Sequence, residues 1–383
     1  MDTIKYNKEN TPNASKLMES LRYSGYDNNI AISDLIDNSL DANAINVNVE
    51  INLDSKRDSY IMIVDDGVGM DEETLGQALR LGSVTHRNIE SDLGRFGMGM
   101  VTASISIAKR VEVFTKQKDK PMLTSIMDID EMAKNNNFNI YREKSTPEEV
   151  KFAQLNGLED FGTVLVLRKC DKLTKPGIVE FKDSLKKDIG ETYRYFLRSG
   201  KKIKVNGELV EIVDPMWTDG TLTEEYKQKS EIFSDEKYEI KIDGTDKKET
   251  FTVKIYILPK FDQVIMRKLK IGIKNQGFYI LRNYRQISKS DDLGGIWNKD
   301  PHLNNIRAEI IFSGTLDLAM GINYTKHSIK PIQAVIDKLQ NDIMSQIQTL
   351  AGRNKKDSRR ESVKDLNFSE AEKLKIQLAK NDF

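Results

Sequence analysis

The chain has 383 residues, of which 38% are hydrophobic and 31% charged, and because one core rarely serves such a length we expect two domains. Lysine plus arginine equals aspartate plus glutamate, at 59 each, which excludes a general electrostatic bias toward nucleic acid. No apolar run is long enough to span a bilayer, and we expect no secretory signal at the start of the sequence. The single cysteine, Cys170, excludes a disulfide within the chain. We therefore expect a cytoplasmic protein with no membrane partner.

The first half of the chain predicts an α+β sandwich, a sheet covered by helices on one face. Apolar positions near a 3.6-residue period predict a helix from about Thr11 to Ala44. After it we expect strands at 47–53 and 60–65, a helix at 70–81, an irregular loop at 82–93 long enough to be a lid, a helix at 101–108, and strands at 110–116, 122–127 and 162–168.

A junction helix over 177–197 separates this part from a second domain. The pair Asn206-Gly207 lies between alternating segments and predicts a hairpin near its start. Further strands are expected at 238–242, 251–258, 277–282 and 306–312, and a helix at 332–350. The domains are therefore expected at 1–175 and 201–350, with a junction at 176–200 and a charged helix or flexible tail at 351–383.

An asparagine and two acids share one face of the first predicted helix. Asp34, Asn38 and Asp41 are separated by four and three residues. Such a polar stripe is ordinary on an amphipathic helix. It also provides what a magnesium and phosphate site needs, which is a hard oxygen ligand and a base near water. The spacing of the histidines and the cysteine does not suit zinc, so we expect a metal only together with a nucleotide.

Two glycine motifs follow the acidic helix. In Asp65-Asp-Gly-Val-Gly69 the glycines permit a tight turn at a strand end, and the Asp65 carboxylate can accept a hydrogen bond from an exocyclic amine. Gly94-Arg-Phe-Gly-Met-Gly99 precedes a helix, so its backbone amides could cradle phosphates. Taken singly, these motifs also fit a plain turn and a glycine hinge. Their order and spacing together favour one nucleotide site.

These segments, together with Gly162-Thr163, resemble the nucleotide site of the GHKL ATPases. That superfamily includes DNA gyrase, the ninety-kilodalton heat-shock chaperone, histidine kinases, MutL and the MORC proteins. The resemblance implies a Bergerat-type ATP-binding domain that uses ATP and Mg²⁺. Asn38 would ligate magnesium, Asp65 would bind the adenine amine, and Thr163 would support adenine recognition. The other implied binding residues are Asp41, Gly67, Gly69, Met70, Gly82, Ser83, Thr85, Gly94, Arg95, Phe96, Gly97, Met98, Gly99 and Met100.

Asp34 is where the sequence departs from the family pattern. The hydrolytic relatives carry a glutamate at this position as the general base. Aspartate has the same chemistry but is one methylene shorter, and proton transfer needs a heavy-atom distance near 3 Å or one bridging water. We therefore expect slow ATP hydrolysis, and an ATP-sensing switch without hydrolysis remains the alternative.

The second half resembles the ribosomal-protein-like transducer domain of gyrase, MutL and MORC proteins. The segment 193–207 is similar to its entry, and Arg282-Asn-Tyr-Arg285 is similar to a strand motif of MORC-like members. On this resemblance Lys326 would contact the γ-phosphate as a sensor, although a lysine near a strand end is also common on surfaces. Exchange of residues 1–28 between two copies would make a nucleotide-dependent homodimer.

The leading hypothesis is an ATP-dependent conformational switch of MORC-like or chaperone-like type, which acts on DNA as a clamp or on a protein client. One alternative is a non-hydrolytic ATP-binding module that recruits a protein partner through the charged C-terminus. Another is a histidine kinase. Kinases put their phosphoacceptor helix before the nucleotide domain, whereas no histidine here precedes His86.

Overall fold

The computed structural model forms two compact units. One contains Met1–Asp214 with Asn283–Arg285, and the other contains Pro215–Arg282 with Gln286–Phe383. The structure describes residues 12–23, 25–53, 58–83, 90, 92–94, 99–173, 177–219, 228–241, 248–322 and 329–360. No helix in these ranges combines the length and the apolar character needed to cross a membrane.

The first unit is built on a mixed sheet whose strand order is β5-β4-β3-β6-β2-β1-β7-β8 in the described part of the chain. The strands are β1 (Asn46–Leu53), β2 (Ser59–Asp65), β3 (Arg110–Lys116), β4 (Leu123–Asp128), β5 (Tyr141–Lys144), β6 (Gly162–Arg168), β7 (Lys202–Val205) and β8 (Glu208–Leu209). The helices are α1 (Ala14–Arg22), α2 (Asn28–Asp41), α3 (Glu72–Ala78), α4 (Gly99–Ile107), α5 (Ile129–Asn135), α6 (Pro147–Leu155), α7 (Ile178–Thr192) and α8 (Arg194–Arg198). The predicted α+β class is therefore confirmed.

The predicted helix over residues 11–44 is wrong in one respect, because it is two helices. Gly25 has a φ of +79°, a left-handed conformation that interrupts a right-handed helix. The Asp27 side chain then accepts a hydrogen bond from the Asn29 backbone amide and caps the start of α2. The polar residues of the acidic stripe consequently lie on a separate helix with its own capped N-terminus.

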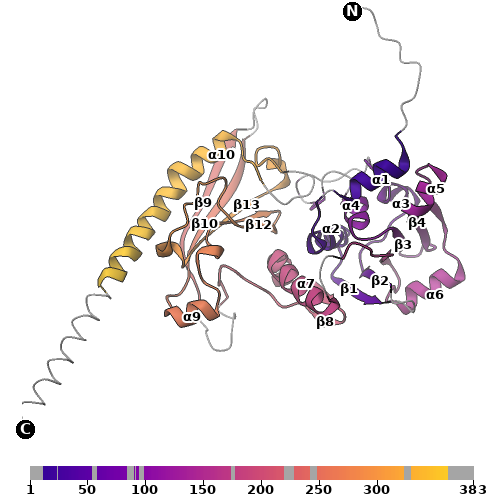
Figure 1. Ribbon diagram of the computed structural model, residues 1–383, viewed down its shortest axis with the longest axis horizontal. Helices are drawn as coiled ribbons and strands as arrows, with labels where there is room; N and C mark the ends of the chain where they lie inside the picture. The colour runs from indigo at the N-terminus through magenta and orange to yellow at the C-terminus, as the bar shows by residue number, and fades with distance from the viewer. Residues whose placement is uncertain are drawn as a thin grey trace, which may run out of the picture. The chain divides into compact units, whose positions relative to one another are not determined.

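Both faces of the first sheet carry apolar cores. Ile61 and Ile63 of β2 join the large core that includes α1, α2 and α4, which lie together in Figure 1. The alternate residues Met62 and Val64 point to the opposite face and pack in a smaller core that includes α6. The prediction that helices cover one face was thus incomplete. Burial of both faces explains why β2 reads as a continuous apolar run.

The hairpin at Asn206-Gly207 extends the first sheet, although we expected it at the start of the second domain. Both residues have positive φ, 49° and 80°, as a two-residue hairpin turn requires. Strand β7 pairs in parallel with β1, and Ile203 and Val205 are buried in the large core. Alternation and turn chemistry identified the hairpin correctly, but they carry no information about which sheet it joins.

The second unit has a sheet of strand order β12-β11-β13-β10-β9 within the residues described. Its strands are β9 (Glu231–Lys241), β10 (Lys248–Ile257), β11 (Phe278–Arg282), β12 (Arg285–Asp291) and β13 (Ile306–Phe312). Helix α10 (Gln333–Lys338) packs on β9, and the short helix α9 spans Gln263–Lys268. The chain stays helical through a π-helical turn at Leu339–Ile343 as far as residue 360. Residues 361–383 of the predicted tail lie outside the described residues.

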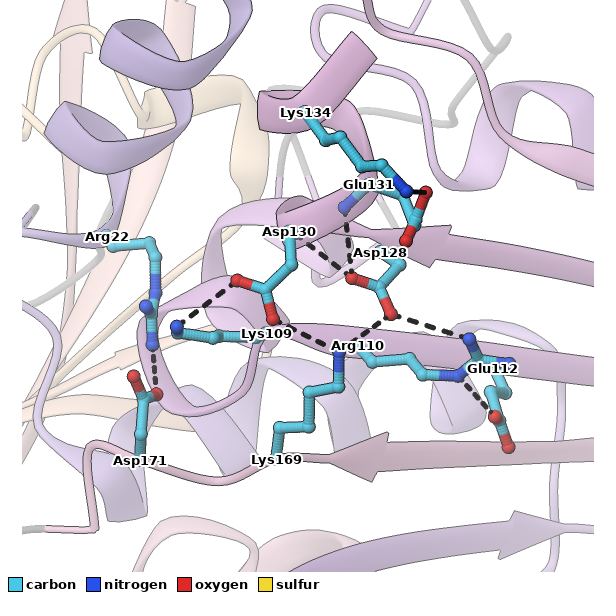
Figure 2. A network of polar contacts seen from close by, with 10 residues as sticks. All are labelled: Arg22, Lys109, Arg110, Glu112, Asp128, Asp130, Glu131, Lys134, Lys169 and Asp171. Atoms are coloured by element: carbon cyan, nitrogen blue, oxygen red, sulfur yellow. Dashed lines mark hydrogen bonds and ion pairs between the residues drawn. The ribbon is translucent and has the colours of Figure 1, made fainter.

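A network of ion pairs joins β3, β4, β6 and α5 at one edge of the first unit (Figure 2). Asp128 caps α5 by accepting hydrogen bonds from the backbone amides of Asp130 and Glu131. Its second carboxylate oxygen lies 3.4 Å from Arg110 and 3.1 Å from Lys169. Because the Asp128 side chain is 9% exposed, these contacts are less screened by water than ordinary surface pairs.

Candidate functional site

A cavity of about 260 Å³ lies in the first unit, next to α2, the end of β2, α3, the start of α4 and β6. Its lining is Leu35, Asn38, Ser39, Asp41, Ala42, Ile63, Asp65, Val68, Gly69, Met70, Thr74, Gln77, Ala78, Ser83, Asp92, Met100, Thr163 and Leu165. Apolar walls with a few convergent polar groups are typical of small-molecule sites. The acidic helix, the Asp65 turn, Met100 just after the glycine-rich segment, and Thr163 thus contribute residues to one cavity.

Asp65 is the buried acid of this cavity. One of its carboxylate oxygens accepts a 2.7 Å hydrogen bond from the Ser39 hydroxyl, and the other accepts a 3.0 Å hydrogen bond from the Gly67 backbone amide. Burial raises the pKa of Asp65, and the hydrogen bonds from Ser39 and Gly67 oppose that rise. Each carboxylate oxygen can accept more than one hydrogen bond, so capacity for a ligand donor remains.

A threonine pair borders the same end of the cavity. The hydroxyl groups of Thr115 and Thr163 lie 3.1 Å apart, and both side chains are buried. Thr115 also accepts a hydrogen bond of 2.9 Å from the Met70 backbone amide. The pair therefore joins β3 and β6 to the turn that follows Asp65, which fixes the shape of this wall.

The glycines of the Asp65 turn are required by backbone packing. A Cβ atom on Gly67 would lie 2.8 Å from the Cβ atom of Ala42. Gly69 has a φ of +68°, and a Cβ atom there would lie 2.1 Å from the Lys116 carbonyl oxygen. Gly69 lines the cavity but Gly67 does not. The close approach of β3 and the end of α2 to the turn therefore explains why both positions are glycine.

Asp41 holds the backbone that leads into the glycine-rich segment. Its two carboxylate oxygens accept hydrogen bonds from the backbone amides of Leu93, at 2.8 Å, and Gly94, at 2.9 Å. Burial raises the pKa of Asp41 to about 6, although these two hydrogen bonds oppose the rise. Asp41 thus contributes both to the cavity wall and to the anchoring of the predicted lid.

Asn38 is oriented by its own helix. Its side-chain nitrogen donates a 3.0 Å hydrogen bond to the Asp34 carbonyl oxygen, so its amide oxygen is the atom that this bond does not use. An amide oxygen beside a phosphate is a suitable magnesium ligand. No cluster of three or more His, Cys, Asp or Glu side chains able to hold a metal occurs in the described ranges. The Asn38 amide oxygen alone therefore fits a magnesium ion that is bound together with a nucleotide.

Asp34 is buried and is absent from the cavity lining. Its oxygens lie 3.1 Å from the Arg285 guanidinium and 3.0 Å from the Tyr26 hydroxyl, which donates the hydrogen bond. Arg285 also donates to Asp37 at 3.0 Å. Burial alone would lower the pKa of Arg285, but the adjacent carboxylates outweigh it and raise that pKa above its ordinary value.

The other predicted site residues fall into two groups. Gly82, Gly94 and Gly99 are described but do not line the cavity. Thr85, Arg95, Phe96, Gly97, Met98 and Lys326 lie outside the described residues. The roles predicted for all of these residues stay predictions.

The sequence interpretation missed several residues of the site. Ser39 lies beside Asn38 in the acidic segment and lines the cavity, but no motif in the sequence singled it out. Asp92 precedes the glycine-rich segment and lines the cavity, as do Thr74 and Gln77 of α3. Arg285 was noted only as part of a strand motif, because no local pattern links it to a helix some 250 residues earlier.

Comparison with known proteins bears directly on this region. Residues 26–163 match the family model described as histidine kinase-, DNA gyrase B-, and HSP90-like ATPase. The chain is 32% identical over 92 residues to ATPase MORC2A of Mus musculus and to ATPase MORC2 of Homo sapiens. It is 30% identical over 93 residues to Protein MICRORCHIDIA 5 of Arabidopsis thaliana.

These relatives are much longer than the matched segment. The alignment covers 23% of this chain in each case, and it covers 9% of the mouse and human proteins and 13% of the plant protein. The family match includes α2, the Asp65 turn and Thr163, which are the elements that surround the cavity. Residues 26–163 therefore match an ATPase domain of the GHKL superfamily, and part of the chain is similar to MORC proteins.

Proposed function

We propose that the first unit binds ATP with Mg²⁺ in the cavity and hydrolyses it slowly. The observation that carries this proposal is the buried Asp65 carboxylate, which is held by Ser39 and Gly67 and faces a cavity that Asn38 and Thr163 also line. A buried acceptor at the end of an apolar-walled cavity suits the exocyclic amine of adenine. Asn38 would hold the magnesium ion, which when bound neutralises phosphate charge.

Asp34 is the proposed general base. It would accept a proton from a water molecule as the water oxygen bonds to the γ-phosphorus and the bond to the β-phosphate oxygen breaks, giving ADP and phosphate. Because aspartate is one methylene shorter than glutamate, this step would be slow. Lys326 is proposed to contact the γ-phosphate as a sensor.

A second candidate function is ATP sensing without hydrolysis. It is favoured by the position of Asp34, which is bound to Arg285 and Tyr26 and does not line the cavity. In that case ATP binding alone would shift the conformational equilibrium of the chain.

The partners belong to the same proposal. We propose a nucleotide-dependent homodimer, for which the similarity to MORC proteins is the support, and a client that is DNA or another protein. We further propose that the second unit is transducer-like and that the protein is cytoplasmic. A DNA clamp would remain on closed circular DNA in the presence of ATP and would be lost from it without nucleotide.

Calorimetric titration with ATP and a phosphate-release assay test the two candidate functions. Asn38→Ala is expected to weaken binding of Mg·ATP, whereas Asp34→Asn is expected to keep binding and to abolish phosphate release. Glu148→Gln, an exposed acid on α6, is the matched control and should behave as wild type. Equal phosphate release by wild type and Asp34→Asn would exclude Asp34 as the base. Binding without any release would establish the sensing alternative.

A further inference from the structure

The three residues Asn283–Arg285 belong to the first unit although they lie at the junction of β11 and β12. Arg285 inserts a buried guanidinium beside α2, where it is 4% exposed. Its Nε atom lies 3.0 Å from Asp37, and its Nη2 atom lies 3.1 Å from Asp34. One cation therefore bridges two buried acids on the same helix, in the forked geometry that only arginine offers.

Two tyrosines complete this buried cluster. Tyr26 donates a hydrogen bond to the Asp34 oxygen opposite the one that Arg285 contacts. The Tyr193 hydroxyl lies 2.7 Å from Asp37 and 2.6 Å from the Ser33 carbonyl oxygen. Both oxygens of Asp34 are thus in contact with donors other than water, and the residue does not line the cavity, so its side chain must turn away from this cluster to reach a water molecule there.

The same three residues also contact the rim of the cavity. The Asn283 side chain donates a 3.1 Å hydrogen bond to the Asp92 carbonyl oxygen. Asp92 lines the cavity, and the next two residues donate their backbone amides to Asp41. Asn283 and Arg285 therefore connect the cavity rim to Asp34 through a span of three residues.

The backbone at this tip is in an uncommon conformation. Asn283 and Tyr284 have φ values of 48° and 64°, as the centre of a two-residue hairpin turn demands. Asparagine tolerates this region, but tyrosine adopts it rarely, and such residues persist where surrounding contacts fix them. Here the Tyr284 ring packs on Tyr195 with a centroid distance of 5.4 Å.

We propose that Arg285 is a positioning residue that holds Asp34 retracted from the cavity, and that nucleotide contact with the Asp92 rim releases it through Asn283. The inference rests on the proposed role of Asp34 in hydrolysis. The role inferred for Arg285 differs from the γ-phosphate contact proposed for Lys326, because Arg285 acts on the general base Asp34 and not on the nucleotide.

The test uses the full chain, ATP titration and single-turnover phosphate release. Arg285→Lys keeps the positive charge that two buried acids require but cannot bridge both with separate N–H groups. We expect its hydrolysis rate to rise about three- to tenfold, as when one charge-assisted hydrogen bond is weakened, with the Kd for ATP changed less than twofold. Tyr26→Phe removes the other donor to Asp34 without a charge change and should also raise the rate. Arg267→Lys, an exposed arginine on α9, should match wild type.

The rate increase separates positioning from a purely structural role, since a merely weakened fold lowers activity. A rate that is unchanged or reduced in Tyr26→Phe and in folded Arg285→Lys would overturn the inference while leaving the proposed ATPase intact. Failure of the wild-type chain to bind ATP, or equal phosphate release by Asp34→Asn, would instead overturn the proposed function, and the inference with it.

Tyr284→Trp provides a readout that does not depend on hydrolysis. A tryptophan at this exposed tip should change its fluorescence when a non-hydrolysable ATP analogue with Mg²⁺ is added, and the added Asn38→Ala substitution should abolish that change. No change in fluorescence in a protein shown by calorimetry to bind the analogue would contradict release of the tip.

Discussion

Ser39 donates a 2.7 Å hydrogen bond to Asp65, and both side chains are more than nine-tenths buried. The two residues come from different elements, α2 and the end of β2, and meet at the wall of the cavity. This contact orients the carboxylate proposed to bind adenine.

Ser39→Ala is therefore expected to weaken ATP binding. Losing the hydroxyl leaves a buried carboxylate oxygen without one donor, which costs about 1–3 kcal/mol, equivalent to about five- to 150-fold in Kd if the loss falls on the bound state. Calorimetric titration with ATP measures this change. Ser104→Ala is the control, because the Ser104 hydroxyl is buried with no hydrogen-bond partner among the described residues and its removal should leave Kd unchanged. Equal affinities for both variants would show that Ser39 does not support the site.

The raised pKa of Asp41 should make the free energy of unfolding depend on pH. Its pKa is about 6 in the folded chain, above the ordinary value of 3.8, because burial disfavours the charged form. Between pH 3.8 and about pH 6 the folded state therefore binds more protons than the unfolded state. The contribution of Asp41 to the free energy of unfolding is largest below the lower value and is lost as the pH rises to about 6.

Asp41→Asn should remove this contribution to the pH slope. Chemical denaturation of wild type and variant at pH 4.5 and pH 7.5 measures it, and the wild type should lose more stability than the variant as the pH rises. Asparagine offers one acceptor oxygen where aspartate offers two, so one of the Leu93 and Gly94 amides loses its partner at both pH values. Parallel pH profiles would contradict the assignment.

Gly69→Ala tests the packing of the Asp65 turn. Alanine would need a positive φ and would place its Cβ atom 2.1 Å from the Lys116 carbonyl oxygen, so the turn must move. We expect a loss of about 2 kcal/mol or more in the free energy of unfolding, together with weaker ATP binding. Gly352→Ala lies in a helix where, apart from the helix's own nearby backbone, no described atom is within 4 Å of the added Cβ, and it should instead stabilise the chain by up to about 1 kcal/mol.

Local patterns predicted the elements of the first unit because each pattern is a short-range property. The alternation in β1 and the apolar run in β2 correctly indicated strands of an α+β domain, and the resemblance of the motifs to GHKL ATPases agrees with the family match. The break at Gly25 was missed, although no aliphatic residue lies between Leu21 and Ile30 and both Gly25 and the Asp27 cap mark the interruption.

Contacts distant in sequence were beyond prediction. The association of Arg285 with Asp34 depends on how β11 and β12 are placed, which no periodicity encodes. The same holds for the pairing of β7 with β1, since alternation specifies a strand but not its neighbour. The motifs therefore named the chemistry of the site, while the partners that orient each group came from the fold.

Asp128 offers a final prediction about the ion-pair network of Figure 2. Asp128→Ala removes the N-cap of α5 and the contacts with Arg110 and Lys169, leaving two cations without a largely buried partner. We expect a loss of about 1–3 kcal/mol in the free energy of unfolding, because a lost cap alone costs about 0.5–2 kcal/mol. Glu131→Gln is the control: its 4.0 Å pair with Lys134 is widely exposed and should contribute almost nothing. Denaturation of both variants in high salt separates the contribution of the ion pairs from that of the helix cap, because salt screens the ion pairs but leaves the cap in place. A loss in Asp128→Ala that disappears entirely in salt would show that the cap contributes nothing.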